Sequence, residues 1–260
     1  MKRCLLGLFV LIALAGCARK ATTTLTVITD DSTPLTTIDI SVTVSDIQDD
    51  KEALNIYLTN LQAIDYEINQ TAVTDAKKGI ISYQQNTITN VIKKGDSGYY
   101  YTDTRSSLVN RTHTAYFNGS NVSYKDRNQD YKDVTLEEYR SIYGIAPFDY
   151  SLMGFIANDE TINSISRERI DDYYLFTVEL DVEKATNNTK IQMKEFGDLS
   201  DYPIFHYLVV TVKMAEDFSP ISSTVESEYE VSVNFLGNMT CKQVIEGIYK
   251  TENISDIPNK

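Results

Sequence analysis

The chain has 260 residues, 42% of them hydrophobic, and a formal net charge of −13 at pH 7. This composition can form a substantial core, and the length suits one large domain or two small ones. Because an acidic chain is repelled by nucleic acid and by anionic lipid headgroups, we expect no nucleic-acid partner and no basic membrane-binding surface.

The first residues have the layout of a secretory signal. Residues 1–3 (MKR) are positive, residues 4–14 (CLLGLFVLIAL) are almost unbroken apolar sequence, and the small residues Ala15 and Gly16 follow. A helix of that apolar length rises about 16 Å, at about 1.5 Å per residue, and is too short for a hydrocarbon core of about 30 Å. We therefore expect residues 1–16 to be a signal peptide rather than a membrane span.

The end of this leader, Leu14-Ala15-Gly16-Cys17, resembles the lipobox of bacterial lipoproteins. In that family the cysteine thiol receives a diacylglycerol, and a peptidase cuts immediately before it. The resemblance implies cleavage between Gly16 and Cys17, lipid attachment at Cys17, and anchoring at the extracytoplasmic face of a cell membrane, on a Gram-positive surface or in a Gram-negative envelope. Two or more acyl chains hold a protein stably on a bilayer. The alternative is an ordinary signal with an incidental cysteine.

The three cysteines provide no disulfide framework. Cys4 would leave with the leader and Cys17 would be acylated, which leaves Cys241 without a partner. Cys241 is either a reactive thiol or, more commonly for such a residue, a small buried hydrophobe. Stability must then come from burial of apolar surface rather than from cross-links.

A polar, threonine-rich segment follows the lipidation site. We expect residues 17–33 to form a lipidated tether and residues 34–260 to form a single β-rich domain of up to about 230 residues. Within that domain, Asp49 to Asp65 is predicted to be a helix, with acidic residues in its first turn where the helix dipole favours anions. Its apolar residues recur at three- and four-residue steps: Leu54, Tyr57, Leu58, Leu61 and Ile64.

Most of the remaining chain alternates apolar and polar residues, which predicts strands with one buried face and one wet face. The predicted strands are Ile38–Val44, Tyr66–Val73, Ile80–Ile92, Tyr99–Thr102, Thr112–Phe117, Val122–Tyr124, Tyr173–Val182, His206–Met214 and Thr224–Phe235. Asn118-Gly119 is a strong hairpin signal, and Lys94-Gly95, Asp171-Asp172 and Gly237-Asn238 are further predicted turns. Short turns between consecutive strands predict an up-and-down antiparallel sheet.

Two helices are predicted in mid-chain. Thr135 to Tyr143 begins with a capping-box pattern, Thr135 to Glu138, and Phe148 to Asn158 has apolar residues at helical spacing. We expect both helices to cover one face of the sheet, since an uncovered sheet of this length would expose a broad apolar surface.

This order of elements behind a lipobox is similar to the LolA/LolB-like lipoprotein-carrier family. Thr114 to Tyr139 is similar to a recurring segment there, in which an aromatic hairpin with a glycine turn leads into a short helix. The resemblance covers roughly Asp49 to the end of the chain and departs from the family at Ile38–Val44, ahead of the first helix. It implies an α+β fold: a long curved antiparallel β-meander, or half-barrel, with an N-terminal amphipathic helix and mid-chain helices covering its concave face. By analogy it also implies an apolar cavity that accepts acyl chains.

Patterns for catalysis, cofactors and metals are missing. His113 and His206 have no metal-ligand spacing, no GxSxG or SxxK marks a nucleophile, and no glycine-rich phosphate loop occurs. Residues 126–130 (DRNQD) lack the glycine and distal glutamate of a calcium loop. We therefore expect no enzyme, no cofactor and no metal site.

Two hypotheses remain open. The first is a membrane-tethered, monomeric, non-enzymatic protein that binds a lipid or another apolar ligand in a cavity between sheet and helices. The second is a structural or protein-interaction lipoprotein with a closed core and no ligand. The candidate cavity lining is Leu54, Leu58, Leu61, Phe148, Leu152, Phe155, Ile156, Phe176, Val178, Leu208, Val210, Val231 and Val233.

Overall fold

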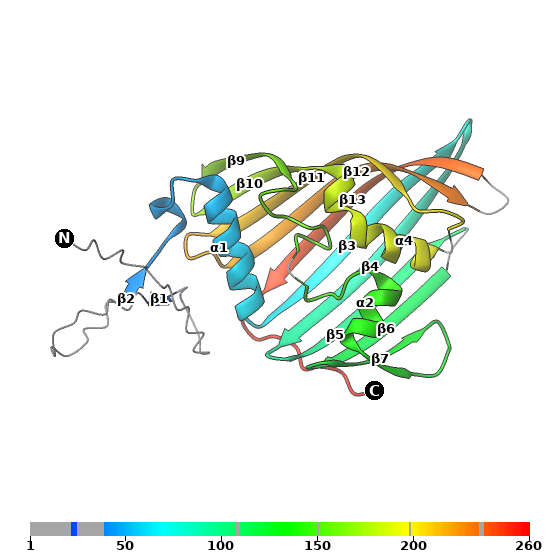
Figure 1. Cartoon of the computed structure of the whole chain (residues 1–260), viewed down its shortest axis with the longest axis horizontal. Helices are drawn as coiled ribbons and strands as arrows, with labels where there is room; N and C mark the ends of the chain where they lie inside the picture. The colour runs from blue at the N-terminus through cyan, green and yellow to red at the C-terminus, as the bar shows by residue number, and fades with distance from the viewer. Residues whose placement is uncertain (1–21, 25–38, 108–109, 150, 198, 234–236) are drawn as a thin grey trace, which may run out of the picture.

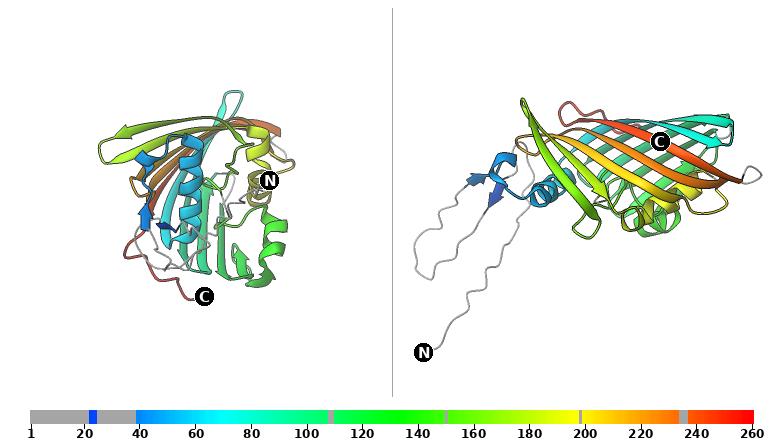
Figure 2. Two further views of the ribbon diagram at one scale, coloured as in Figure 1. Left: turned by 60° about the vertical axis from the view of Figure 1, so that its left-hand side comes forward. Right: turned by 90° about the horizontal axis from the view of Figure 1, so that it is seen from above.

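A computed structural model describes residues 22–24, 39–107, 110–149, 151–197, 199–233 and 237–260. The dominant feature is one antiparallel sheet of eleven strands, curved so that one face is concave (Figures 1 and 2). The helices lie on the concave face, as the sequence predicts for an α+β half-barrel. The leader, the lipobox and most of the predicted tether lie outside the described residues.

The sheet consists of two meanders joined by one long-range pairing. In space the strands run β8-β7-β6-β5-β4-β3-β13-β12-β11-β10-β9, so the last strand of the chain pairs with β3. Because β8 and β9 are two separate edges, the sheet is open. The strands are β3 (Tyr66–Lys78), β4 (Ile81–Lys94), β5 (Ser97–Ser106), β6 (Asn110–Asn118), β7 (Asn121–Asp126), β8 (Lys132–Thr135), β9 (Ile162–Ile170), β10 (Tyr173–Leu180), β11 (Ile204–Ala215), β12 (Pro220–Val233) and β13 (Gly237–Lys250).

The predicted two-residue period determines which side chains face the concave side. In β10, Tyr174, Phe176 and Val178 are at most 5% exposed, whereas Thr177 and Glu179, which point to the other face, are exposed. The other predicted strands are confirmed except at some of their ends. Ile80 lies in the turn before β4, residues 234 and 235 lie outside the described residues, and the ends at Ile38, Val44 and Val182 are described below. Three strands, β8, β9 and β13, were not predicted from the sequence.

Two predicted helices are confirmed with their caps. α1 (Asp50–Ala63) begins at Asp49, whose carboxylate accepts hydrogen bonds from the backbone of Lys51 at 2.8 Å and Glu52 at 3.0 Å. α2 (Leu136–Tyr143) begins with the predicted capping box, in which Thr135 and Glu138 bond each other's backbone N–H groups. None of the helices in the described part of the chain is both long and apolar enough to span a bilayer.

The predicted helix from Phe148 to Asn158 is wrong. This segment is a loop that contains a tight turn, in which Leu152 and Phe155 exchange two backbone hydrogen bonds of 2.8 and 2.9 Å. Met153 and Gly154 have φ values of 53° and 94°, which a right-handed helix cannot contain. The helical spacing of apolar residues instead reflects how the loop packs on the sheet.

Two helices occur where the sequence analysis predicted none, α3 (Val182–Ala185) and α4 (Asn187–Gly197). Val182, predicted as the last residue of a strand, begins α3 because the Asp181 carboxylate accepts from the backbone N–H groups of Glu183 and Lys184. α2 and α4 lie side by side on the concave face (Figure 1).

A separate two-stranded sheet precedes α1. β1 (Thr22–Thr24), within the predicted tether, pairs with β2 (Asp39–Ser41). The predicted strand Ile38–Val44 is therefore confirmed over Asp39–Ser41, while Val44 begins the 3₁₀ turn η1 (Val44–Asp46) and Ile38 lies outside the described residues.

Two apolar clusters cover the concave face. The first, which we call the α1 cluster, joins α1 to β3, β4, β9–β13 and the loop after α2. The second, the aromatic cluster, joins α2 to β6 and β7 through Ala115, Phe117, Val122, Tyr124, Tyr139, Tyr143 and Ala146. Phe148 and Tyr100 pack against both clusters.

Candidate functional site

Most of the predicted cavity residues pack against one another in the α1 cluster. At most 6% of the surface of each of these residues is exposed: Leu54, Leu58, Leu61, Leu152, Phe155, Phe176, Val178, Leu208 and Val210. Val231 is partly buried against the cluster, and Ile156 and Val233 are partly exposed. The structure thus brings most of the set together on the concave face. That these residues enclose a ligand stays a prediction.

A pocket of about 360 Å³ lies beside this cluster, and Phe148 is the predicted residue that lines it. We call it the α1–α2 pocket because it is bounded by the C-terminal end of α1, by α2, and by the turns after β4 and β6. Its lining is Gln62, Lys93, Gly95, Asp96, Ser97, Phe117, Gly119, Leu136, Arg140, Ala146, Phe148 and Asp149. The volume is near the lower end of the range for small-molecule sites.

Two aromatic rings form the apolar wall of the α1–α2 pocket. The rings of Phe117 and Phe148 meet edge to face, with centroids 5.0 Å apart. Gly98 in β5 makes room for this arrangement, since a Cβ atom there would lie 2.1 Å from Cζ of Phe148. The small residue in the strand therefore positions the ring.

Two cationic side chains share the pocket with these rings. Lys93 is 9% exposed and donates a 2.8 Å hydrogen bond to the carbonyl of Ile64, and burial lowers the pKa of its ammonium group. Arg140 contacts both carboxylate oxygens of Asp149 through Nε, at 3.1 and 3.0 Å, and this partner raises the pKa of the guanidinium group. The pocket thus combines an apolar wall with charges of both signs, because Asp96 and Asp149 line it together with Lys93 and Arg140.

A buried polar network in the aromatic cluster was missed by the sequence analysis. His113 Nδ1 lies 2.6 Å from Asp126 Oδ1, and His113 Nε2 lies 2.9 Å from the Tyr139 hydroxyl. Tyr143 donates a 2.7 Å hydrogen bond to the other oxygen of Asp126, and Arg111 lies 3.2 Å from that oxygen. Every polar atom of the imidazole has a partner.

The protonation of this network follows from its surroundings. Burial lowers the pKa of His113, and a neutral ring that donates from Nδ1 to Asp126 and accepts at Nε2 from Tyr139 satisfies all three groups. Burial would raise the pKa of Asp126, but the hydrogen bonds of His113 and Tyr143 and the charge of Arg111 hold it well below its ordinary value. His113 is 0% exposed, and through its hydrogen bonds to Asp126 and Tyr139 it links β6, β7 and α2.

A second pocket of about 560 Å³ lies at the β8 edge of the sheet. Polar side chains and Lys260 dominate its lining, and the nearby Tyr116 hydroxyl donates a 3.2 Å hydrogen bond to the carbonyl of Asn259. None of the predicted cavity residues lines this pocket. In the described part of the chain, no group of three or more His, Cys, Asp or Glu side chains is arranged to hold a metal ion.

Comparisons with known proteins place no family name on the chain. No protein-family model matches it, and no curated protein matches it in sequence. Among solved structures, a DUF1329 family protein from Desulfovibrio piger is 11% identical with a TM-score of 0.29, over 80% of this chain and 96% of that one. An N-terminal dehydratase from the difficidin assembly line is also 11% identical, with a TM-score of 0.13, over 78% of this chain and 83% of that one. Similarities of this size assign no function.

Proposed function

We propose that the protein is a bacterial lipoprotein, held at the extracytoplasmic face of a membrane by a diacylglyceryl group on Cys17. The observation that carries this proposal is the leader: a positive start, a short apolar stretch, and Leu14-Ala15-Gly16-Cys17 at its end. An acidic domain gains no electrostatic attraction to anionic lipids, so attachment depends on the acyl chains.

Replacement of the acylated sulfur tests this proposal. Cys17→Ser should abolish incorporation of an alkyne-labelled palmitate, leave the leader uncut, and release the protein from the lipid-anchored fraction. Cys4→Ser is the matched control, because it removes a cysteine within the leader and leaves the lipobox intact. Unchanged labelling and processing in Cys17→Ser would refute the anchor.

We further propose that the domain binds an amphiphilic ligand in the α1–α2 pocket and catalyses no reaction. The edge-to-face rings of Phe117 and Phe148 offer an apolar surface, and charged side chains of both signs lie beside it: Lys93, Asp96, Arg140 and Asp149. A ligand with a short apolar part and a polar group matches both features.

Ligand uptake tests the second proposal separately from the anchor. Protein purified from cells should carry a low-molecular-mass amphiphile in native mass spectrometry and should bind a fluorescent fatty acid. Gln62→Trp should fill the pocket and reduce binding, whereas Thr59→Trp, an exposed position on the same helix outside the lining, should not. Equal binding by both variants would place the ligand elsewhere.

A second candidate function is protein interaction through a closed domain without ligand. The tight packing of the α1 cluster favours it, since the residues predicted to line a cavity contact one another instead. Recovery of the wild type with no bound amphiphile and no fatty-acid uptake would support this candidate over ligand binding.

A further inference from the structure

A methionine occupies a backbone position that usually selects glycine or asparagine. Met153 and Gly154 are the central residues of the turn between Leu152 and Phe155, and both have positive φ. Two-residue turns of this kind favour Asn-Gly, and a non-glycine residue there carries a conformational cost. The side chain of Met153 is therefore the feature to explain.

The turn that presents Met153 is held in place from both sides. The flanking residues Leu152 and Phe155 are each 2% exposed, and Thr189 of α4 donates a 2.6 Å hydrogen bond to the carbonyl of Gly154. The turn therefore fixes the direction in which the Met153 side chain leaves the backbone.

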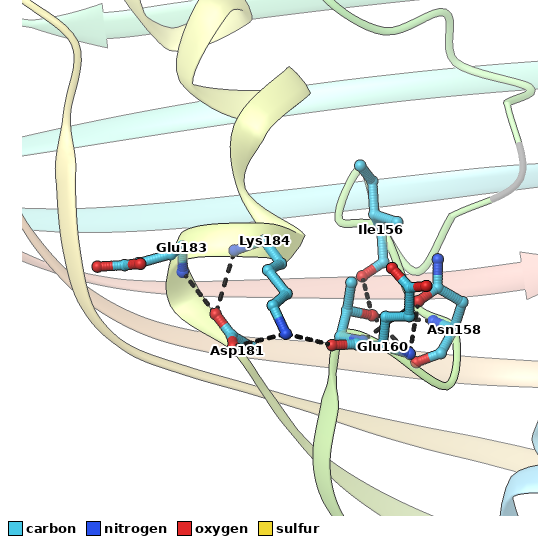
Figure 3. A network of polar contacts seen from close by, with 7 residues as sticks. Ile156, Asn158, Glu160, Asp181, Glu183 and Lys184 are labelled. Carbon is cyan, nitrogen blue, oxygen red and sulfur yellow. Dashed lines mark hydrogen bonds and ion pairs between the residues drawn. The ribbon is translucent and has the colours of Figure 1, made fainter.

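The rest of the loop is tied to the start of α3 (Figure 3). Thr161 donates a 2.9 Å hydrogen bond to the carbonyl of Ile156, and Lys184 donates one of 3.2 Å to the carbonyl of Glu160. The Asp181 carboxylate caps the helix that carries Lys184. Anchoring at this end limits how far the loop can move away from the sheet.

Two hydrogen-bond donors point at the sulfur of Met153. Gln70 Nε2 on β3 lies 3.4 Å from Sδ, and the Tyr249 hydroxyl on β13 lies 3.9 Å from it. Gly247 provides the space, since a Cβ atom there would lie 2.9 Å from Cε and 3.3 Å from Sδ of Met153. The Met153 side chain is partly buried and keeps some contact with solvent.

A thioether is a weak acceptor and makes poor use of two donors, whereas a sulfoxide oxygen is a strong acceptor. We propose that Met153 is a site of oxidation to methionine sulfoxide, with Gln70 and Tyr249 as the groups that receive the new oxygen. The oxidant is a peroxide. With hydrogen peroxide, the sulfur attacks one oxygen and the O–O bond breaks. The proton of the transferred oxygen passes to the leaving hydroxide, which departs as water. The sulfur loses two electrons, the peroxide gains them, and the two donors bind the oxygen as its negative charge develops.

The chain provides its own controls. Met193 is also partly buried, and it receives no hydrogen bond from the side chains that the structure describes. Met214 and Met239 are 0% and 2% exposed. In the full chain as purified from cells and exposed to graded hydrogen peroxide, peptide mass spectrometry should show Met153 oxidised first, Met193 second and the two buried methionines last. We expect Met153 to be oxidised about five times faster than Met193, because one modest hydrogen bond to the developing oxygen changes a rate by about that factor.

Removal of the donors separates this role from simple exposure. Tyr249→Phe and Gln70→Leu should each lower the ratio of Met153 to Met193 oxidation, with Met193 serving as an internal check on unfolding. Gln243→Leu is the control, because Gln243 lies on the same side of β13 as Tyr249 but donates its hydrogen bond to Thr74, at 2.9 Å, and not to Met153. The proposal is overturned if Met153 and Met193 react at equal rates in the wild type, or if both donor variants leave the ratio unchanged.

Discussion

The buried imidazole of His113 should make the domain less stable in mild acid. In the unfolded chain this histidine has its ordinary pKa of 6.5, whereas burial lowers the pKa in the folded domain. Below pH 6.5 the unfolded state therefore binds a proton that the native state does not. The free energy of unfolding then falls by up to about 1.4 kcal/mol per pH unit until the folded pKa is reached.

Between pH 6.5 and pH 5 this single group can remove at most about 2 kcal/mol of stability. The neighbours of His113 do not titrate in that window. The pKa of Asp126 is lowered, so this carboxylate stays ionised and its contribution to folding stability is lost only in stronger acid. Burial raises the pKa values of Tyr139 and Tyr143, so both hydroxyls stay protonated. The slope in this interval therefore reports His113.

Urea unfolding between pH 7.5 and pH 5, followed by circular dichroism, measures the slope. His113→Gln should be less stable than the wild type at pH 7.5, because Asp126 and Tyr139 lose their partner, and should lose most of the pH dependence. His206→Gln is the matched control, since His206 is the second of the two histidines and its side chain is 50% exposed. Stability that rises on acidification, or a slope retained in His113→Gln, would refute the reasoning.

Three further predictions concern packing, reactivity and capping. Gly144→Ala should lower the free energy of unfolding by about 3 kcal/mol, because φ is 77° and a Cβ atom would lie 2.2 Å from the carbonyl oxygen of Asn188. Gly154→Ala is the control: φ is 94° but the space around it is open, so it should lower the free energy of unfolding by only about 1 kcal/mol. Equal losses in the two variants would contradict the clash at Gly144. Cys241 should resist iodoacetamide in the native protein and react after unfolding, because burial raises the pKa of its thiol to about 11. Alkylation of Cys241 in the native protein would contradict this prediction. Thr135→Ala should cost about 1 kcal/mol in urea unfolding through loss of the capping box, while Thr135→Ser should cost less.

Local sequence patterns predicted those elements whose stabilising contacts are themselves local. The three- and four-residue spacing of Leu54, Tyr57, Leu58 and Leu61 predicted α1, and these side chains are all buried. The capping boxes and acidic first turns are read from residues within one helical turn. No such local pattern indicates that β13 pairs with β3, since that contact joins residues that are far apart in the sequence.

The strand β13 was missed because both of its faces carry apolar residues. Its concave-side residues include Cys241 and Ile245, but Val244 and Ile248 point to the other face and are 43% and 68% exposed. Two apolar sets out of phase remove the period of two on which strand prediction depends.

The His113 network was missed because of a one-residue error in a turn. With Asn118-Gly119 as the central pair, His113 would face Tyr124 across the hairpin. In the structure Asn118 still pairs with Asn121, so the turn lies one residue later and His113 faces Asp126. Tyr124 and Asp126 lie two residues apart on the same face of β7, so which of them pairs with the buried histidine depends on the exact register.

In the candidate site, a residue that lies on the concave side of the sheet does not necessarily line a cavity. Alternation correctly placed Phe176, Val178 and Val210 on the concave side, but whether these side chains line a cavity depends on what covers them. Here α1 and the loop after α2 pack directly on that surface, and the α1–α2 pocket forms at the boundary of the two clusters, beside Phe148. At that boundary Gly98 admits the Phe148 ring, and the loop that follows contains the tight turn at Met153 and Gly154. Both depend on tertiary packing and backbone geometry rather than on periodicity. A ligand site in this fold should therefore be sought where two packed clusters meet rather than within the more apolar one.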